Sequence, residues 1–245
     1  MKLSPIVKFK ISEKRDFDTV CAFAKDSKYD DGRSLQWATY DKYPELKELL
    51  EDGIIKNKKA LRQFIHKEYM AKREGMLLAL AVNKKHWEKI AQQYYSLVDG
   101  LFNHRPWPKG KYIAYGTIWG MYPRFLEDKI FLIPFKHRAP KYIPVVVAHE
   151  LLHFMFYYYF YSHYPKYRKP TNNYFVWHVS EIFNSIVQNS PTWLQLFHQK
   201  SISYPEHAKV VSRLRRKYYR RSVWDIAELT DEIIEEVKKN KSLYS

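Results

Sequence analysis

The chain has 245 residues, of which 46% are hydrophobic and 17% aromatic, so it is long and apolar enough to bury a substantial core. Seven glycines are too few for the many turns of an all-β fold, and the single cysteine, Cys21, excludes an internal disulfide and favours a reducing, cytoplasmic compartment. The formal net charge of +16 favours contact with nucleic acid, anionic surfaces or acidic proteins, and it does not bear on the fold.

The N-terminal segment is predicted to contain a short strand and two short helices. No signal peptide is expected, because the first residues lack an apolar core and a small-residue cleavage site. Alternation of apolar and polar residues predicts a strand at 6–11, and 17–25 is predicted to be a helix. Residues 26–43 are typical of a loop, after which Pro44 begins a helical pattern that Gly53 would end.

Two longer helices and a linker are expected next. Apolar periodicity predicts helices at 58–74 and 76–102, and an interruption of the second near Asn83 is left open. Their histidines, His66 and His86, lie among lysines and are expected on the surface. The segment that follows, 103–110, contains two prolines and a glycine and is predicted to be a linker.

Two strands are predicted after the linker, at 111–119 and 129–135, with a loop at 120–128. Pro134 lacks a backbone N–H, so the second strand fits the edge of a sheet better than its centre, although pairing on both sides fits its apolar sequence equally well. Helices and strands together predict a mostly helical α+β fold with a small sheet.

The stretch 144–161 is predicted to be a buried helix, and it contains the pattern H-E-x-x-H at His149, Glu150 and His153. Residues four apart lie on one face of a helix, so the two imidazoles can bind one metal ion. Glu150 projects about 100° further round the helix, where it can take a proton from a metal-bound water. Because these polar groups interrupt the apolar run, a membrane span is not expected.

A core cluster without a metal is the alternative for this motif. A chance motif should fall on a solvated face, because an unpaired buried glutamate costs several kcal/mol. Here the flanks are almost entirely apolar, which favours the metal site.

The segment V-x-A-H-E-L-L-H-F-M at 146–155 resembles the zinc-binding helix of the zincin metallopeptidases. The resemblance implies that His149 and His153 bind one catalytic Zn²⁺ and that Glu150 is the catalytic base. It also implies a zincin-like core in which a small antiparallel sheet packs on the metal helix. In that core, an edge strand before this helix pairs with an extended peptide substrate, and 129–135 is expected in that role.

A catalytic zinc needs a third protein ligand. The metzincin extension is absent, because Phe156 and Tyr159 occupy its Gly and third His positions. A predicted helix at 174–187 is apolar almost all round and contains a glutamate, Glu181, that needs a strong partner. This resembles the gluzincin pattern, which implies Glu181 as the third ligand; His178 and His163 are the alternatives.

Supporting roles around this site are less sharply indicated. Gluzincins often place a carboxylate four residues beyond the third ligand to orient a zinc-bound histidine, but this chain has Ser185 there, beside Asn184. The donor to the oxyanion of the transition state is expected to be His178 or a tyrosine, and the candidate tyrosines are Tyr159, Tyr174 and Tyr204.

The C-terminal tail is expected to form two or three helices, over 192–200, 205–221 and 223–239. A basic cluster within it is predicted to be a solvated face, or else a weak polyanion or nucleic-acid contact: Arg213, Arg215, Arg216, Lys217, Arg220 and Arg221. His198 and His207 are expected on the surface.

The expected function is zinc-dependent hydrolysis of peptide bonds in a peptide or protein substrate. One domain is expected, with a helical part at 1–110, a catalytic core at 111–190 and a basic tail at 191–245. One alternative is an SprT-like protease that acts on DNA-bound proteins, although that family usually takes a third histidine soon after the motif. A non-catalytic basic nucleic-acid-binding module is the other.

Overall fold

A computed structural model describes residues 4–23, 39, 42–51, 54–136, 140–168 and 174–240. These residues are mostly helical with a small sheet, which confirms the α+β class. The chain divides into two compact units. The helical unit combines Met1–Ser4, Trp87–Lys109 and Pro144–Ser245, and the sheet unit combines Pro5–His86 and Gly110–Ile143. One boundary, between Lys109 and Gly110, lies within one residue of the division expected at 110, whereas no boundary lies at 190, and the single domain stays a prediction.

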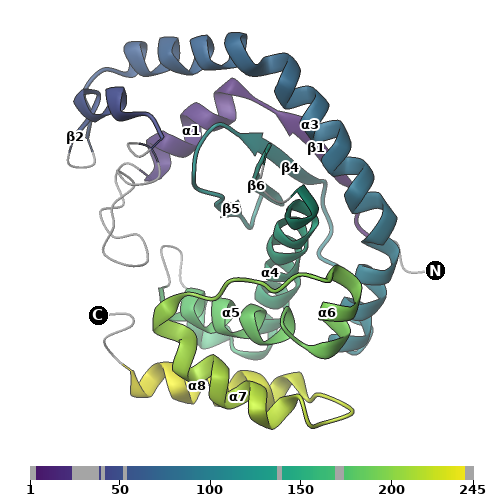
Figure 1. The fold of residues 1–245 in the computed structure, drawn as a ribbon. Coiled ribbons are helices and arrows are strands. Elements are labelled where there is room, and N and C mark those ends of the chain that lie inside the picture. The colour runs from purple at the N-terminus through teal and green to yellow at the C-terminus, as the bar shows by residue number, and fades with distance from the viewer. Residues whose placement is uncertain are drawn as a thin grey trace. The chain divides into compact units, whose positions relative to one another are not determined.

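The sheet has four strands in the order β1 (Val7–Ile11), β4 (Tyr112–Thr117), β6 (Ile130–Pro134) and β5 (Arg124–Phe125) (Figure 1). β4 pairs in parallel with both β1 and β6, and only β5 runs antiparallel to its neighbour. The expectation of an antiparallel sheet is therefore wrong, and the sheet is mixed. Parallel neighbours need long connections, and here helices and loops separate β1 from β4.

The edge position expected for 129–135 is also wrong. β6 lies between β4 and β5 and is buried along its whole length, so the alternative of pairing on both sides is the correct one. The cause is β5, a two-residue strand inside the predicted loop at 120–128, which is too short to show periodicity. Pro134 is tolerated because β5 pairs only with Ile130 and Phe131.

Short elements of the sheet unit differ from prediction at their ends. α1 (Glu13–Phe23) begins four residues earlier than expected, because the Ser12 hydroxyl accepts a hydrogen bond from the backbone N–H of Arg15 at 3.1 Å. The helix expected from Pro44 is only a 3₁₀ helix, η1 (Pro44–Glu48). An antiparallel hairpin of two-residue strands, β2 (Leu50–Glu51) and β3 (Ile54–Ile55), follows it. Gly53 and most of the predicted loop at 26–43 lie outside the described residues.

A single helix of 44 residues, α3 (Lys58–Leu101), replaces the two helices predicted at 58–74 and 76–102. Gly75 does not end the helix, because buried residues such as Tyr69 and Met76 continue its apolar face on both sides. No interruption occurs at Asn83, whose side chain is buried and donates to the Phe135 carbonyl at 3.1 Å. The core of the sheet unit gathers α1, η1, α3 and the end of β4 around Phe17, Leu46, Leu61, Ile65 and Trp119.

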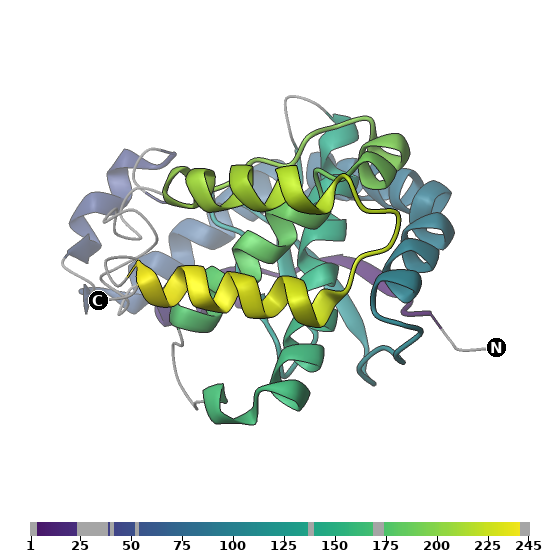
Figure 2. The ribbon, with the colours of Figure 1, turned by 90° about the horizontal axis from the view of Figure 1, so that it is seen from below.

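The helical unit is built on two buried helices, α4 (Ile143–His163) and α5 (Tyr174–Val187), whose bounds lie within two residues of prediction. Three further helices follow: α6 (Pro191–Phe197), α7 (Ala208–Tyr218), which the 3₁₀ turn η4 (Pro205–His207) precedes, and α8 (Ile226–Lys239). Figure 2 shows α7 and α8 side by side, and both contact α5. Asn172 and Asn173, either of which the sequence allows as the N-cap of α5, lie outside the described residues.

The three tail helices are each shorter than predicted. α6 ends early because His198 takes a left-handed conformation with φ of 52°. α8 begins at its N-cap Asp225, whose carboxylate accepts from the backbone N–H groups of Ala227 and Glu228. Within the part of the chain that the structure describes, no helix is long and apolar enough to cross a membrane.

Candidate metal centre

The H-E-x-x-H motif lies in the middle of α4, and its histidines face α5. His149 and His153 lie one turn apart, and Glu181 reaches them from α5. His153 and Glu181 are almost wholly buried, whereas the side chain of His149 is 21% exposed. The cluster is therefore buried on its inner side, and His149 is its partly exposed member.

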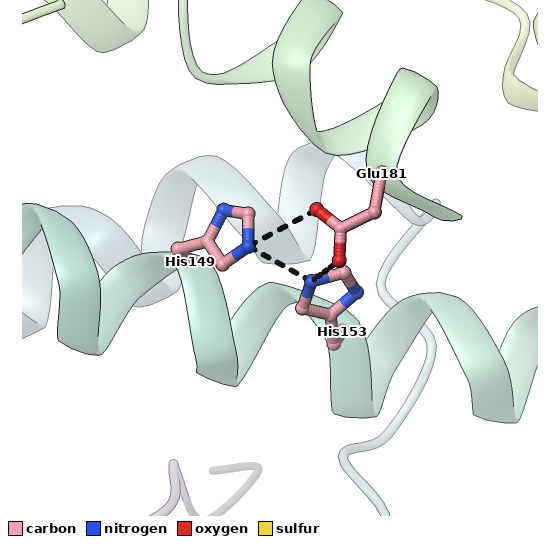
Figure 3. Close-up of side chains that lie close together, drawn as sticks. All are labelled: His149, His153 and Glu181. Carbon is pink, nitrogen blue, oxygen red and sulfur yellow. Dashed lines mark hydrogen bonds and ion pairs between the residues drawn. The ribbon is translucent and has the colours of Figure 1, made fainter. Parts of the chain in front are cut away.

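The three side chains converge at ion-binding distances (Figure 3). His149 Nε2 lies 3.0 Å from His153 Nε2 and 3.3 Å from Glu181 Oε2, and His153 Nε2 lies 3.1 Å from Glu181 Oε1. Ligands at the usual zinc distance of about 2.0–2.1 Å stand about 3.3 Å apart at the corners of a tetrahedron. The two imidazole nitrogens, and the carboxylate oxygens that each of them faces, are therefore spaced about as far apart as the ligands of one tetrahedral ion.

Gln188 sets which ring nitrogen carries the proton in neutral His149. Its Oε1 accepts from the Ser201 hydroxyl at 3.0 Å and stands 2.7 Å from His149 Nδ1, so Nδ1 carries the proton and donates. In the neutral ring, Nε2 then presents its lone pair to His153 and Glu181. A zinc-bound imidazole needs this tautomer.

The sequence did not single out Gln188, which lies seven residues beyond Glu181 instead of four. The amide of Asn184 also contributes, because it donates to the backbone carbonyl of His149 at 3.2 Å. Ser185, at the position four residues beyond Glu181, accepts from Asn189 through its own carbonyl and is not placed by any described contact against the histidines. The only sequence feature that could have indicated a role for Gln188 is its long polar side chain, directly after the apolar helix α5.

Electrostatics at the cluster favour a cation. Burial lowers the pKa of His149, but the Glu181 carboxylate, the Glu150 charge and the Gln188 hydrogen bond outweigh it and raise the pKa to about 9. Without a metal, a proton on His149 therefore balances the negative charge of the cluster. A bound divalent ion would displace that proton.

Glu150 lies beside the cluster and outside it. It is 4% exposed, and its charge is one of the causes that raise the pKa of His149. Glu150 is not among the three side chains whose ligand atoms converge. A position next to the three candidate ligands, and not among them, is the one that a proton acceptor would need.

The alternative third ligands, His178 and His163, lie elsewhere. His178 is buried one turn before Glu181, and its Nδ1 stands 2.8 Å from His207 Nε2. His163 ends α4, where it stacks on Tyr159 at 4.0 Å. Of the three, only Glu181 meets the motif histidines.

The remaining histidines and tyrosines divide between surface and interior. His66 and His198 are exposed, as predicted, and His86 is half-buried. The surface position expected for His207 is wrong: it is 0% exposed, because η4 turns it toward α5. Burial, and then the neighbouring His178, lower the pKa of His207 to about 4, so its ring is neutral at pH 7.

The tyrosines proposed as oxyanion donors lie at three different places. Tyr174 is half-buried at the start of α5 and Tyr159 is buried on α4. Tyr204 packs against Trp177, with ring centroids 5.0 Å apart.

The basic cluster on α7 is partly neutralised by α8. Arg213 pairs with Glu236, and both Lys217 and Arg221 pair with Glu228. Exposed pairs of this kind stabilise little, but they occupy charges that a polyanion would need. Arg215, Arg216 and Arg220 belong to no ion pair among the described residues.

No family model, curated protein or solved structure matches this chain. The resemblance to the zincins therefore stays a prediction that rests on the motif and on Glu181. Function has to be inferred from the geometry of the cluster.

Proposed function

We propose that the protein is a zinc-dependent metallopeptidase of the gluzincin type, with Zn²⁺ held by His149, His153 and Glu181. The observation that supports it best is the convergence of two imidazole nitrogens and one carboxylate from two buried helices, with distances of 3.0–3.3 Å between facing atoms. Two imidazoles and a carboxylate are the ligand set of several zinc peptidases, in which a water occupies the fourth position.

The chain's own residues divide the work of peptide hydrolysis. Zinc, when bound, would bring the pKa of a water ligand toward neutrality and polarise the scissile carbonyl. Glu150 accepts the proton of the attacking water at its carboxylate and then delivers it to the leaving amine. Gln188 holds His149 in the ligating tautomer, and burial of His153 and Glu181 keeps bulk water from the inner side.

The order of elements supports a zincin-like arrangement. The strands of the sheet come first, then the metal helix α4, and then α5 with the third ligand. The DNA-associated alternative has less support, because the third donor is Glu181 and half of the basic cluster is paired with α8.

Replacement of Glu150 by Gln tests this function. Glu150→Gln removes the proton acceptor and no ligand, so zinc content should stay at the wild-type value while cleavage of an unfolded protein such as casein falls at least about 100-fold. The exposed Glu127→Gln variant is the matched control and should cleave at the wild-type rate. Unchanged cleavage by Glu150→Gln would refute the general-base role, and a wild-type protein without zinc would refute the proposal.

A further inference from the structure

A second group of metal-ligating side chains gathers beside the N-terminal half of α5. His178 comes from α5, and Glu206 and His207 come from η4. One ligand atom from each lies within 4.8 Å of the others. His178 and His207 are 4% and 0% exposed, so chance contact on a solvated surface does not account for the cluster.

Some buried polar atoms of this group have no hydrogen-bond partner among the described residues. His178 Nδ1 and His207 Nε2 stand 2.8 Å apart and can share one proton. That leaves His207 Nδ1 and Glu206 Oε1, which are both buried and have no hydrogen-bond partner among the described residues. An unpaired buried nitrogen and an unpaired carboxylate oxygen both destabilise a folded protein, and here they belong to two of the three side chains whose ligand atoms converge.

Aromatic rings surround the group. The Trp177 ring lies 4.7 Å from that of His178 and 5.8 Å from that of His207, and Tyr204 lies 5.6 Å from His207. Such walls limit the access of water and lower the local dielectric constant, which strengthens the attraction between a carboxylate and a cation.

We propose that His178, His207 and Glu206 form a second site for a divalent transition-metal ion, separate from the site at His149, His153 and Glu181. Imidazole nitrogens with one carboxylate suit Zn²⁺, whereas Mg²⁺ and Ca²⁺ prefer oxygen ligands throughout. His178 and Glu181 lie three residues apart on one helix, so α5 supplies one ligand to each ion. The second ion would fasten η4 and the start of α7 to α5.

Metal content measures this site directly. The protein is purified without chelators, equilibrated with Zn²⁺ and desalted. Its zinc content per chain is then measured by elemental mass spectrometry. Wild type should hold two equivalents of zinc. His207→Gln and Glu206→Gln should each hold one, as should Glu181→Gln, and Glu181→Gln combined with His207→Gln should hold none. His66→Gln, an exposed histidine in the sheet unit, is the matched control and should keep two.

The outcomes separate the two sites. One equivalent in wild type that Glu181→Gln abolishes and His207→Gln keeps would overturn the second site and show that its imidazoles only share a proton. One equivalent that His207→Gln abolishes and Glu181→Gln keeps would support the second site and refute the first. If His207→Gln does not fold, as judged by circular dichroism, Glu206→Gln decides, because its side chain is only half-buried.

Discussion

Gln188 is a positioning residue whose effect should be measurable through zinc affinity. Gln188→Ala removes the acceptor for His149 Nδ1–H, so the imidazole loses its fixed tautomer and orientation. Zinc affinity is expected to fall about 10- to 100-fold, as measured by competition with a chromogenic chelator. The exposed Gln195→Ala variant is the control and should bind as wild type does.

Gln188→Glu separates orientation from packing. The carboxylate keeps an acceptor opposite Nδ1 and the same side-chain length, so affinity should return to within a few fold of wild type. If Gln188→Ala binds zinc as tightly as wild type, Gln188 only packs the end of α5, and the tautomer is set elsewhere.

Asp16 should make stability depend on pH. Its carboxylate is buried and accepts from Thr117, Tyr69 and the backbone of Ile118, but burial outweighs these bonds and raises its pKa from 3.8 to about 6. The folded state thus binds a proton more tightly than the unfolded state does. Stability from this group is complete below about pH 4 and is lost as pH rises through 6.

The test compares wild type with Asp16→Asn by urea unfolding at pH 4 and pH 7. The free energy of unfolding of wild type, relative to the variant, should fall by about 2.4 kcal/mol between pH 4 and pH 7, which is most of the stabilisation that a shift from 3.8 to about 6 represents at about 1.4 kcal/mol for each unit. Subtracting the two free energies of unfolding cancels the contributions of the titrating groups that both proteins contain. Asp18→Asn, on the same helix but partly exposed, should show no comparable fall, and a flat difference for Asp16→Asn would contradict the raised pKa.

At the scale of elements, a substitution at Gly75 tests whether α3 continues through this glycine as one helix. A Cβ added at Gly75 would meet nothing within 4 Å, so Gly75→Ala should stabilise the protein by about 0.4–1 kcal/mol through helix propensity and a less flexible unfolded chain. Urea unfolding measures the change. A loss of stability would mean that the backbone at Gly75 is not helical.

Gly116 in β4 is the contrasting glycine. A Cβ there would collide with the Leu80 side chain and stand 3.3 Å from Phe135 Cβ, so Gly116→Ala should destabilise the fold by about 1–3 kcal/mol. The two alanine variants thus differ in sign because one glycine faces solvent and the other faces packed side chains.

The longest apolar elements could be predicted from sequence, and the short ones could not. α4 and α5 carry continuous apolar runs bounded by proline and polar residues, so their ends were predicted within two residues. β5, β2 and β3 have two residues each, less than one period of any pattern, and they exist through pairing alone. The central position of β6 could not be predicted for the same reason, because an edge strand and a central strand differ only in which strands pair with them.

At the scale of the whole molecule, removal of zinc should loosen the helical unit and spare the sheet unit. The first-site ligands join α4 to α5, so zinc that binds only the folded state stabilises it by about 4 kcal/mol at a free concentration of 1,000 times Kd. Addition of EDTA should speed backbone hydrogen exchange in α4 and α5 and leave β1, β4 and β6 unchanged.

Glu181→Gln is the control for that experiment, because a variant without the first site has less zinc to lose. Its exchange in α4 should already be fast, and EDTA should change it less than it changes wild type. Equal protection of α4 in wild type with and without EDTA would show that the helices need no ion to stay together.

The sequence by itself determined the local part of this protein: a buried helix with two histidines one turn apart, a carboxylate beside them, and a second apolar helix with one glutamate. Those relations depend on helix periodicity, which acts within a few residues. Only the tertiary structure decided that Glu181 and not His178 meets His149, that Gln188 holds its ring, and that His207 is buried. These contacts join residues 29 to 39 positions apart in the chain. No local sequence pattern predicts these contacts, because they depend on how the helices pack and on where η4 lies against α5.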